Sequence, residues 1–212
     1  MYAFTYERPT TRADAQKLAK AGGKLLAGGQ TLLASMKLRL AAPEQLVDLG
    51  AVKELAGIRK DAAGVTIGAM TRHADVVVSK DVQAAIPALA ALADGIGDKQ
   101  VRAMGTIGGS LANNDPAADY PAAALGLGAT IVTTEREIAA DDYFQGLFAT
   151  ALNEGELITA VRFPQAKRAA YMKFKNPASR FAIVGVFVAD FGGSVRVAVT
   201  GAGSDGVFRA TA

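Results

Sequence analysis

The sequence of 212 residues contains no cysteine and only one histidine. Without cysteine, the chain cannot form a disulfide, bind an iron–sulfur cluster through thiolates or use a thiol as a nucleophile. The lone histidine, His73, cannot form a metal cluster by itself, and no serine or carboxylate is spaced to make a recognisable triad with it. We therefore predict no metal site in this chain and interpret His73 as structural.

The sequence also lacks a long apolar run and a basic stripe. No apolar stretch reaches the roughly 20 residues that span a membrane, and the first residues show no secretory n-region or h-region. We therefore expect a cytoplasmic location and no membrane span. The net charge is +3, but lysine and arginine are scattered, so we expect no nucleic-acid binding. Half of the residues are hydrophobic, which predicts a folded chain of one large or two small domains.

Residues 102–121 form an unusual stretch, Arg-Ala-Met-Gly-Thr-Ile-Gly-Gly-Ser-Leu-Ala-Asn-Asn-Asp-Pro-Ala-Ala-Asp-Tyr-Pro. Paired glycines, here Gly108 and Gly109, let a backbone approach a ligand closely and turn its N–H groups toward that ligand. Asn114 and Asp115 are typical turn residues that shape a loop. Taken alone, such a stretch is interpreted as an ordinary surface loop.

A second stretch of related character lies upstream. Residues 24–33 read Lys-Leu-Leu-Ala-Gly-Gly-Gln-Thr-Leu-Leu, so a short apolar run enters a double glycine and leaves into a helical pattern. This strand–turn–helix arrangement favours an anion site, although neither the P-loop nor the dinucleotide fingerprint is present. Two separate glycine-rich stretches predict a long phosphate-containing ligand held at two points. The alternative for each is an ordinary turn.

Three motifs together resemble a known family. The stretches Ala27–Leu32, Thr106–Ser110 and Asp119–Pro121 resemble the two FAD loops of the flavin subunit of molybdenum hydroxylases, which include carbon monoxide dehydrogenase medium subunits and the flavin parts of xanthine dehydrogenase-like enzymes. The resemblance runs from about Tyr6 to the end of the chain. Weaker matches follow in the family order: Ile67–Ala74, Gln100–Gly105, Tyr171–Phe174 and Thr200–Gly203.

The resemblance implies an α+β protein with the two-subdomain FAD-binding fold of the vanillyl-alcohol-oxidase/PCMH type. We expect subdomains at residues 1–57 and 58–165, and a partial C-terminal α+β domain at 166–212. The family usually continues with helices that pack on that last sheet. The resemblance therefore implies a chain that is cut short or a reduced terminal domain.

Local patterns add specific expectations for the elements. We expect Thr11 to cap a first helix, and we expect a second helix to bury Leu32, Leu33, Met36 and Leu40. Further along the chain, a hairpin is predicted over residues 58–68. Thr71 and Asp81 are expected to cap short helices, and Pro87 is expected to begin another. The predicted strands are residues 2–6, 24–27, 45–49, 129–134, 157–163, 170–175, 182–191 and 194–200.

The resemblance also implies which residues contact FAD. The first glycine segment (residues 27–32) would cradle the pyrophosphate, and the second glycine segment (residues 106–110) would make a further phosphate contact. These residues are Ala27, Gly28, Gly29, Gln30, Thr31 and Leu32, and then Thr106, Ile107, Gly108, Gly109 and Ser110. The family often has a different polar residue where Gln30 stands, so the backbone and not this side chain carries the expectation.

Four more residues complete the predicted site. Asp119 resembles the carboxylate that hydrogen-bonds sugar or ribityl hydroxyls, and its alternative role is to cap the helix after Pro121. Ile96 falls near the flavin ring and Ile158 at a backbone contact, with plain core as the alternative for both. Lys173 falls near the polar edge of the flavin, where a cation favours negative charge on the reduced ring. Its alternative is a solvated strand residue.

For function, the resemblance implies the FAD-binding electron-transfer subunit of a molybdenum-containing hydroxylase. Substrate would be oxidised at a molybdopterin large subunit. Electrons would then pass through an iron–sulfur small subunit to this FAD and on to an external acceptor such as a quinone, NAD or oxygen. Two alternatives stay open. One is a stand-alone flavin oxidoreductase of the same fold, which would need a general base near the ring. The other is a non-enzymatic accessory subunit.

Overall fold

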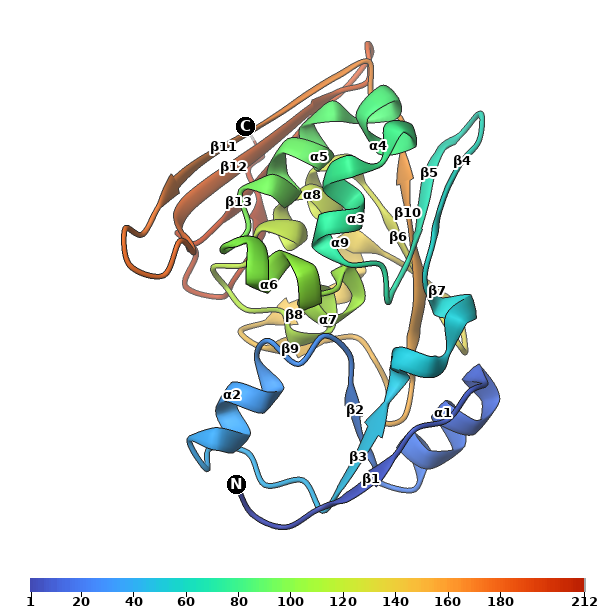
Figure 1. Ribbon diagram of the computed structural model, residues 1–212. Coiled ribbons are helices and arrows are strands. Elements are labelled where there is room, and N and C mark those ends of the chain that lie inside the picture. The colour runs from blue at the N-terminus through green and yellow to red at the C-terminus, as the bar shows by residue number, and fades with distance from the viewer. Residues whose placement is uncertain (212) are drawn as a thin grey trace.

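The computed structural model describes residues 1–211, which form four β-sheets with helices packed between and beside them (Figure 1). The first unit lies at one end of the molecule. Its elements are β1 (Thr5–Glu7), α1 (Arg12–Lys20), β2 (Lys24–Leu26), α2 (Leu32–Lys37), β3 (Gln45–Asp48) and the 3-10 helices η1 (Leu49–Ala51) and η2 (Lys53–Leu55). The three strands pair in parallel in the order β1-β3-β2. Parallel pairing requires crossover connections, which α1 and the segment with α2 provide.

The first unit confirms one predicted feature and corrects another. The hydroxyl of Thr11 accepts the N–H of Asp14 at 3.1 Å, so this residue caps α1 as predicted. The prediction that Leu40 is buried was wrong, because α2 ends at Lys37 and Leu40 is 79% exposed. Arg39 adopts φ 61° directly after the helix and turns the chain away from the helical path. Of the residues in α2, only Met36 is fully buried.

The second unit contains a five-stranded antiparallel sheet in the order β4-β5-β10-β6-β7. Its strands are β4 (Ile58–Lys60), β5 (Gly64–Gly68), β6 (Thr130–Thr133), β7 (Glu137–Ala139) and β10 (Ile158–Pro164). A separate two-stranded sheet is formed by β8 (Phe144–Gly146) and β9 (Ala149–Thr150). The predicted hairpin over residues 58–68 is confirmed by the antiparallel register of β4 and β5.

Helices α3 (His73–Val78), α4 (Lys80–Ala85), α5 (Pro87–Asp94), α6 (Lys99–Met104), α7 (Ile107–Asn113), α8 (Asp119–Leu127) and α9 (Ala140–Tyr143) belong to this unit. Pro87 begins α5 as predicted. Both predicted caps of the short helices were wrong. Ser79, not Asp81, accepts the N–H that caps α4. Thr71 instead exchanges two hydrogen bonds with the backbone of Gly57, which lies before β4.

Most of residues 102–121 is helical, so the alternative interpretation of this stretch as an ordinary surface loop was wrong. Helices α6, α7 and α8 follow one another with short connections at Gly105–Thr106 and Asn114–Ala118. Tertiary contacts override the low helix propensity of the glycine pair, because α7 packs against β5 and β10 and buries Ile107 and Leu111 completely. Asn114 ends α7 in the left-handed conformation, which confirms its turn role.

The third sheet is antiparallel in the order β11-β12-β13-β14. Its strands are β11 (Arg168–Lys175), β12 (Ala182–Asp190), β13 (Val195–Thr200) and β14 (Phe208–Arg209). Figure 1 shows helices of the second unit between this sheet and the five-stranded sheet. Helices α5 and α8 cover the inner face of the third sheet. The outer face carries exposed apolar side chains such as Met172 and Phe174.

Two apolar cores hold these layers together. The larger core lies between the five-stranded sheet, the helices and the third sheet, since it includes Ile67, Leu89, Tyr120 and Phe187. The smaller core packs α1 against β3 and includes Leu157 from the second unit. The three-stranded sheet falls within residues 1–57, the five-stranded sheet within 58–165 and the four-stranded sheet within 166–212. The division into domains at these positions remains a proposal. None of the helices in residues 1–211 has the length and apolar character that crossing a bilayer requires.

Candidate functional site

A cavity of about 770 Å³ runs between the first unit and the helices of the second unit. This volume lies in the range typical of cofactor sites. Of the fifteen residues predicted to contact a cofactor, thirteen line this cavity. They are Ala27, Gly28, Gly29, Gln30, Thr31, Leu32, Ile96, Thr106, Gly108, Gly109, Ser110, Asp119 and Ile158. The fold therefore brings together segments that lie far apart in the sequence.

The first glycine segment lies close to the second and to the residues that lead into it. A Cβ atom added at Gly28 would lie 2.0 Å from the carbonyl oxygen of Met104, and one added at Gly109 would lie 3.5 Å from the Cβ of Ala27. Gly28 is therefore required by the packing of the first segment on the α6–α7 connection. The sequence indicated that the glycines allow the backbone to approach a ligand closely. The structure shows that Gly28 also allows two parts of the protein backbone to approach each other.

The first glycine segment lines the cavity and contains unpaired backbone donors. Within residues 1–211, the amide groups of residues 28–32 have no hydrogen-bond partner in the protein. Gly29 adopts φ 71°, a left-handed conformation that turns the backbone between β2 and α2 and strains a residue with a side chain. Consecutive free N–H groups beside a cavity form a donor set that suits a phosphate group.

The second glycine segment differs, because protein atoms already accept its backbone N–H groups. Ile107 donates to the carbonyl of Thr71 at 3.1 Å and Gly108 to that of Ala69 at 2.8 Å. Gly109 donates to the hydroxyl of Thr106 at 3.1 Å, which caps α7. A Cβ atom at Gly108 would lie 2.6 Å from the Cβ of Ala69, so this glycine is needed for helix–sheet packing.

Side chains of α7, in the second glycine segment and one turn beyond it, supply free polar groups to the cavity. Ser110 and Asn113 both line the cavity, and both are half-buried. They stand three residues apart on α7, so they share one helix face. Neither side chain has a hydrogen-bond partner within residues 1–211. We infer that this segment contributes hydroxyl and amide groups to the cavity in place of backbone donors.

Asp119 contributes the buried carboxylate of the cavity wall. The residue is 5% exposed and begins α8, whose N-cap is Ala118, so the alternative role of Asp119 as a helix cap was wrong. One oxygen accepts the hydroxyl of Tyr171 at 2.5 Å and the other accepts the ammonium of Lys173 at 2.9 Å. Burial raises the pKa of Asp119 above its ordinary value, and the stabilisation of the charged form by Lys173 and Tyr171 offsets only part of this rise.

Two predicted contact residues do not line the cavity. The side chain of Ile107 is fully buried in the larger core, where it serves packing. Lys173 lies behind Asp119 with its side chain 9% exposed, so it is not the solvated strand residue of the alternative interpretation. Its ammonium also donates to the carbonyl of Gly95, next to Ile96. Ile158 lines the cavity but is 7% exposed and packs in the larger core as well.

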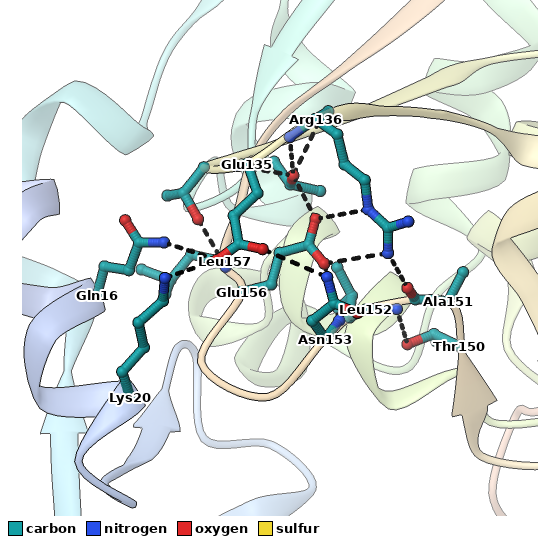
Figure 2. A network of polar contacts seen from close by, with 12 residues as sticks. Gln16, Lys20, Glu135, Arg136, Thr150, Ala151, Leu152, Asn153, Glu156 and Leu157 are labelled. Carbon is teal, nitrogen blue, oxygen red and sulfur yellow. Dashed lines mark hydrogen bonds and ion pairs between the residues drawn. The ribbon is translucent and has the colours of Figure 1, made fainter.

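A wall that the sequence did not predict is formed by residues 152–157, between β9 and β10. Figure 2 shows Arg136 and Asn153 converging on Glu156, which is 4% exposed. This carboxylate accepts the hydroxyl of Thr133 at 2.6 Å, Nε of Arg136 at 3.2 Å and the N–H of Asn153 at 2.8 Å. Burial raises the pKa of Glu156, but these hydrogen bonds outweigh burial and hold the pKa below its ordinary value.

The same network joins this wall to the first unit. Lys20 on α1 pairs with Glu135 at 2.8 Å, and Gln16 donates to the same carboxylate, as Figure 2 shows. Asn153 donates its amide to Glu135 from the cavity wall. A Cβ atom at Gly155 would lie 2.5 Å from Cγ of Lys20. These contacts fix residues 152–157 against α1. Because the contacts join residues far apart in the sequence, no local motif predicted this wall of the cavity.

Phe148 is a second contact that the sequence did not predict. It lines the cavity, is 60% exposed and adopts φ 55°, which is unusual for a residue with a side chain. The side-chain amide of Asn114 donates to the carbonyls of Gly146 and Ala149 on either side of this turn, at 2.9 and 2.8 Å. The buried Asn114 therefore holds an apolar ring at the edge of the cavity.

His73 also lines the cavity, beneath the connection to the second glycine segment. It is 5% exposed, and a Cβ atom at Gly105 would lie 2.6 Å from its Nε2 atom. Burial, with a smaller contribution from the charge of Arg102, lowers the pKa of His73 to about 4. The packing is consistent with the structural role predicted for this residue. Among residues 1–211, no group of three or more histidine, aspartate or glutamate side chains could hold a metal ion.

The cavity, its free amide donors and the surrounding α+β fold define a protein that binds a phosphate-containing cofactor. The chain belongs to the family described as FAD binding domain in molybdopterin dehydrogenase, whose profile matches residues 2–166. It is 42% identical over 190 residues to the carbon monoxide dehydrogenase medium chain of Afipia carboxidovorans. That match covers 85% of this chain and 66% of the relative, so this chain spans about two thirds of that relative's length.

Solved structures show the same fold. Carbon monoxide dehydrogenase from Hydrogenophaga pseudoflava, in a form that lacks the Mo-pyranopterin moiety of its cofactor, matches with a TM-score of 0.91 and 38% identity over 98% of this chain and 77% of its own. Quinoline 2-oxidoreductase from Pseudomonas putida 86 matches with a TM-score of 0.90 and 28% identity over 98% of this chain and 77% of its own. The predicted FAD-binding fold of the PCMH type is thereby confirmed.

These findings confirm FAD as the cofactor and identify the chain as a medium, FAD-binding type of subunit of molybdenum hydroxylases. The residues of the cavity fit this cofactor. Free amide donors suit a diphosphate, a buried carboxylate suits hydroxyl groups, and the half-buried Ile96 suits the face of a planar ring. Which of these residues contact FAD remains a proposal.

Proposed function

We propose that this chain is the electron-transfer subunit of a molybdenum-containing hydroxylase, in which its FAD receives electrons from the iron–sulfur clusters of a partner subunit and passes them to an external acceptor. The observation that carries the proposal is the single cavity shared by both glycine segments and the Asp119 carboxylate. When bound, FAD supplies the redox chemistry. The residues of this chain bind the cofactor, orient it and set the charge around it.

We assign these tasks to separate parts of the cavity. The amide groups of residues 28–32 hold the diphosphate, since they are the unpaired backbone donors. Ser110 and Asn113 add side-chain donors from α7. Asp119 accepts hydroxyl groups of the sugar or ribityl chain. Ile96 lies on the turn after α5 and gives an apolar contact for the ring.

The partners follow from the relatives by analogy. The related medium chains and solved structures belong to carbon monoxide dehydrogenases and to a quinoline oxidoreductase, whose substrates differ widely. Because one type of flavin subunit serves such different substrates, we propose that a molybdopterin large subunit selects the substrate and that an iron–sulfur small subunit delivers the electrons. The acceptor is a quinone, NAD or oxygen.

The first test is an absorption spectrum of the purified chain before and after FAD is added. We expect the flavin bands to shift and sharpen as FAD enters the cavity. Gly109→Leu should abolish this change, because a side chain there enters the space between Thr106 and Ala27. Gly193→Leu is the matched control, since a Cβ atom at Gly193 has no neighbour within 4 Å. Folded wild-type protein that leaves the FAD spectrum unchanged would contradict the proposal.

The second test addresses electron transfer. A chemically reduced iron–sulfur partner subunit, freed of reductant by gel filtration, is mixed with the FAD-loaded chain without oxygen. We expect the flavin absorption to bleach in the complex and to remain unchanged when the partner is oxidised. An FAD-loaded chain that binds the reduced partner but keeps its flavin oxidised would overturn the electron-transfer role and leave cofactor binding intact.

A further inference from the structure

Behind the cavity wall, Asp119 belongs to a buried group of polar side chains. Tyr171 and Lys173 both project from β11 toward this carboxylate, because residues two apart on a strand share one face. The hydroxyl of Tyr171 donates to Oδ1 at 2.5 Å and the ammonium of Lys173 donates to Oδ2 at 2.9 Å. Each carboxylate oxygen thus has one protein donor, and each retains a lone pair for a second donor.

The ammonium of Lys173 is largely used by the protein. It has three N–H donors, of which one goes to Asp119 and one to the carbonyl of Gly95 at 3.1 Å. Its side chain is 9% exposed and does not line the cavity. Lys173 therefore connects the carboxylate to the turn that carries Ile96. This geometry favours an indirect role of Lys173, through Asp119, over direct contact between Lys173 and the cofactor.

The third sheet leaves a specific space for the hydroxyl of Tyr171. Gly185 on β12 is the cross-strand partner of Lys173, and a Cβ atom at Gly185 would lie 2.3 Å from the hydroxyl oxygen of Tyr171. Only a residue without a side chain fits there. The ring of Tyr171 also packs on Phe187, at 6.1 Å between ring centroids. Both contacts fix the direction of the hydroxyl, so it reaches Asp119.

We propose that Tyr171 is a positioning residue of the cofactor site: together with Lys173 it holds the Asp119 carboxylate charged and oriented, with its free lone pairs directed to hydroxyl groups of FAD. This inference rests on the proposed function, since it takes Asp119 as the hydroxyl acceptor. Tyr171 acts only through Asp119. Removal of its hydroxyl leaves one buried carboxylate oxygen without its protein donor, so that Lys173 alone orients the side chain of Asp119.

The test is a cycle of variants of the full chain, with FAD affinity of the cofactor-free protein measured by quenching of flavin fluorescence. Tyr171→Phe should weaken FAD binding about tenfold, the effect of losing one hydrogen bond to a charged group. In the background of Asp119→Asn, the same substitution should change affinity by less than about twofold, because the residue through which it acts is already altered.

Two further variants keep the test decisive. Tyr120→Phe is the matched control, since the Tyr120 hydroxyl is buried beside Asp119 without a partner within residues 1–211, and its loss should leave FAD affinity unchanged. Gly185→Ala retains the Tyr171 hydroxyl but displaces it, and this variant should weaken FAD binding as Tyr171→Phe does. Circular dichroism confirms that each variant is folded.

The outcomes separate this inference from the proposed function. Wild-type protein that is folded but does not bind FAD overturns both. Wild-type protein that binds FAD while Tyr171→Phe binds equally well overturns the positioning role alone. An equal loss from Tyr171→Phe with and without Asp119→Asn also overturns it, because the hydroxyl would then act independently of the carboxylate.

Discussion

The two glycine segments look alike in sequence, but the structure uses them in opposite ways. In the first segment, the amide groups of residues 28–32 have no partner within residues 1–211, and these residues line the cavity. In the second, the amide groups of Ile107, Gly108 and Gly109 all donate to protein acceptors. The first segment keeps its backbone donors for a ligand, while the second uses them to build α7 and seat it on the sheet.

This difference shows that a glycine pair in a sequence indicates a close approach of the backbone, but does not reveal whether the backbone approaches a ligand or another part of the protein. Gly108 lies against Ala69, and Gly28 lies against Met104, so both permit contact between protein backbones. Gly29 is different, because its φ of 71° shapes the segment whose donors remain free. On α7, the free polar groups that line the cavity are the side chains of Ser110 and Asn113.

A large effect on stability is expected at Gly108. In Gly108→Ala, the new methyl group would lie 2.6 Å from the Cβ and 2.7 Å from the carbonyl oxygen of Ala69, and backbone must move to accommodate it. We expect a loss of about 3 kcal/mol in the free energy of unfolding without cofactor, from overpacking. Urea denaturation measures this loss. Unchanged stability would show that the second segment is loosely packed and that Gly108 is not needed for its contact with Ala69.

Acid should destabilise the packing beneath the second segment through His73. Its folded pKa of about 4 lies below the ordinary value of 6.5, so the unfolded chain takes up the proton first as pH falls. The stability is therefore fully present above pH 6.5 and is lost on acidification toward pH 4, by about 3 kcal/mol in total.

The variant His73→Gln removes this titration. We expect urea midpoints measured between pH 7 and 4 to fall less steeply for the variant than for the wild type. Equal slopes would mean that His73 titrates normally and is not buried under the Gly105 connection. Carboxylates that titrate in the same range act in both proteins, so the comparison isolates the histidine.

A matched pair of threonines gives a smaller effect. Thr106 is the N-cap of α7 and accepts the N–H of Gly109, whereas Thr31 is the N-cap of α2 and makes no cap hydrogen bond through its side chain. Thr106→Ala should cost about 1 kcal/mol of stability, and Thr31→Ala should cost roughly nothing in the cofactor-free protein. Thermal unfolding of both variants checks this order. The reverse order would contradict the division between the segments.

The sequence predicted those features of the fold that local chemistry decides. Thr11 caps α1, and Pro87 begins α5, because each needs only its own helix turn. Features decided by distant contacts were not predicted. Leu40 is exposed because α2 ends early, and Thr71 binds Gly57 rather than its own helix. The helical state of α7 depends on packing against β5 and β10, which no local propensity encodes.

The candidate site shows the same limit. Family motifs identified residues whose backbone or side chain reaches the cavity, such as Gly29 and Asp119. They did not reveal Phe148 or the wall at residues 152–157, because these are placed by the buried polar residues Asn114 and Glu156. Nor did they show that Lys173 reaches the cavity through Asp119. Such arrangements depend on the three-dimensional fold and have no fixed spacing in the sequence.

The most direct test of the central claim is a proton–nitrogen correlation NMR spectrum of the labelled chain as FAD is added. We predict that the amide signals of residues 28–32 shift strongly downfield, because free N–H groups gain charged acceptors. The signals of Ile107, Gly108 and Gly109 should change less, because protein atoms already accept these groups. Larger shifts at residues 107–109, with residues 28–32 unchanged, would contradict the account.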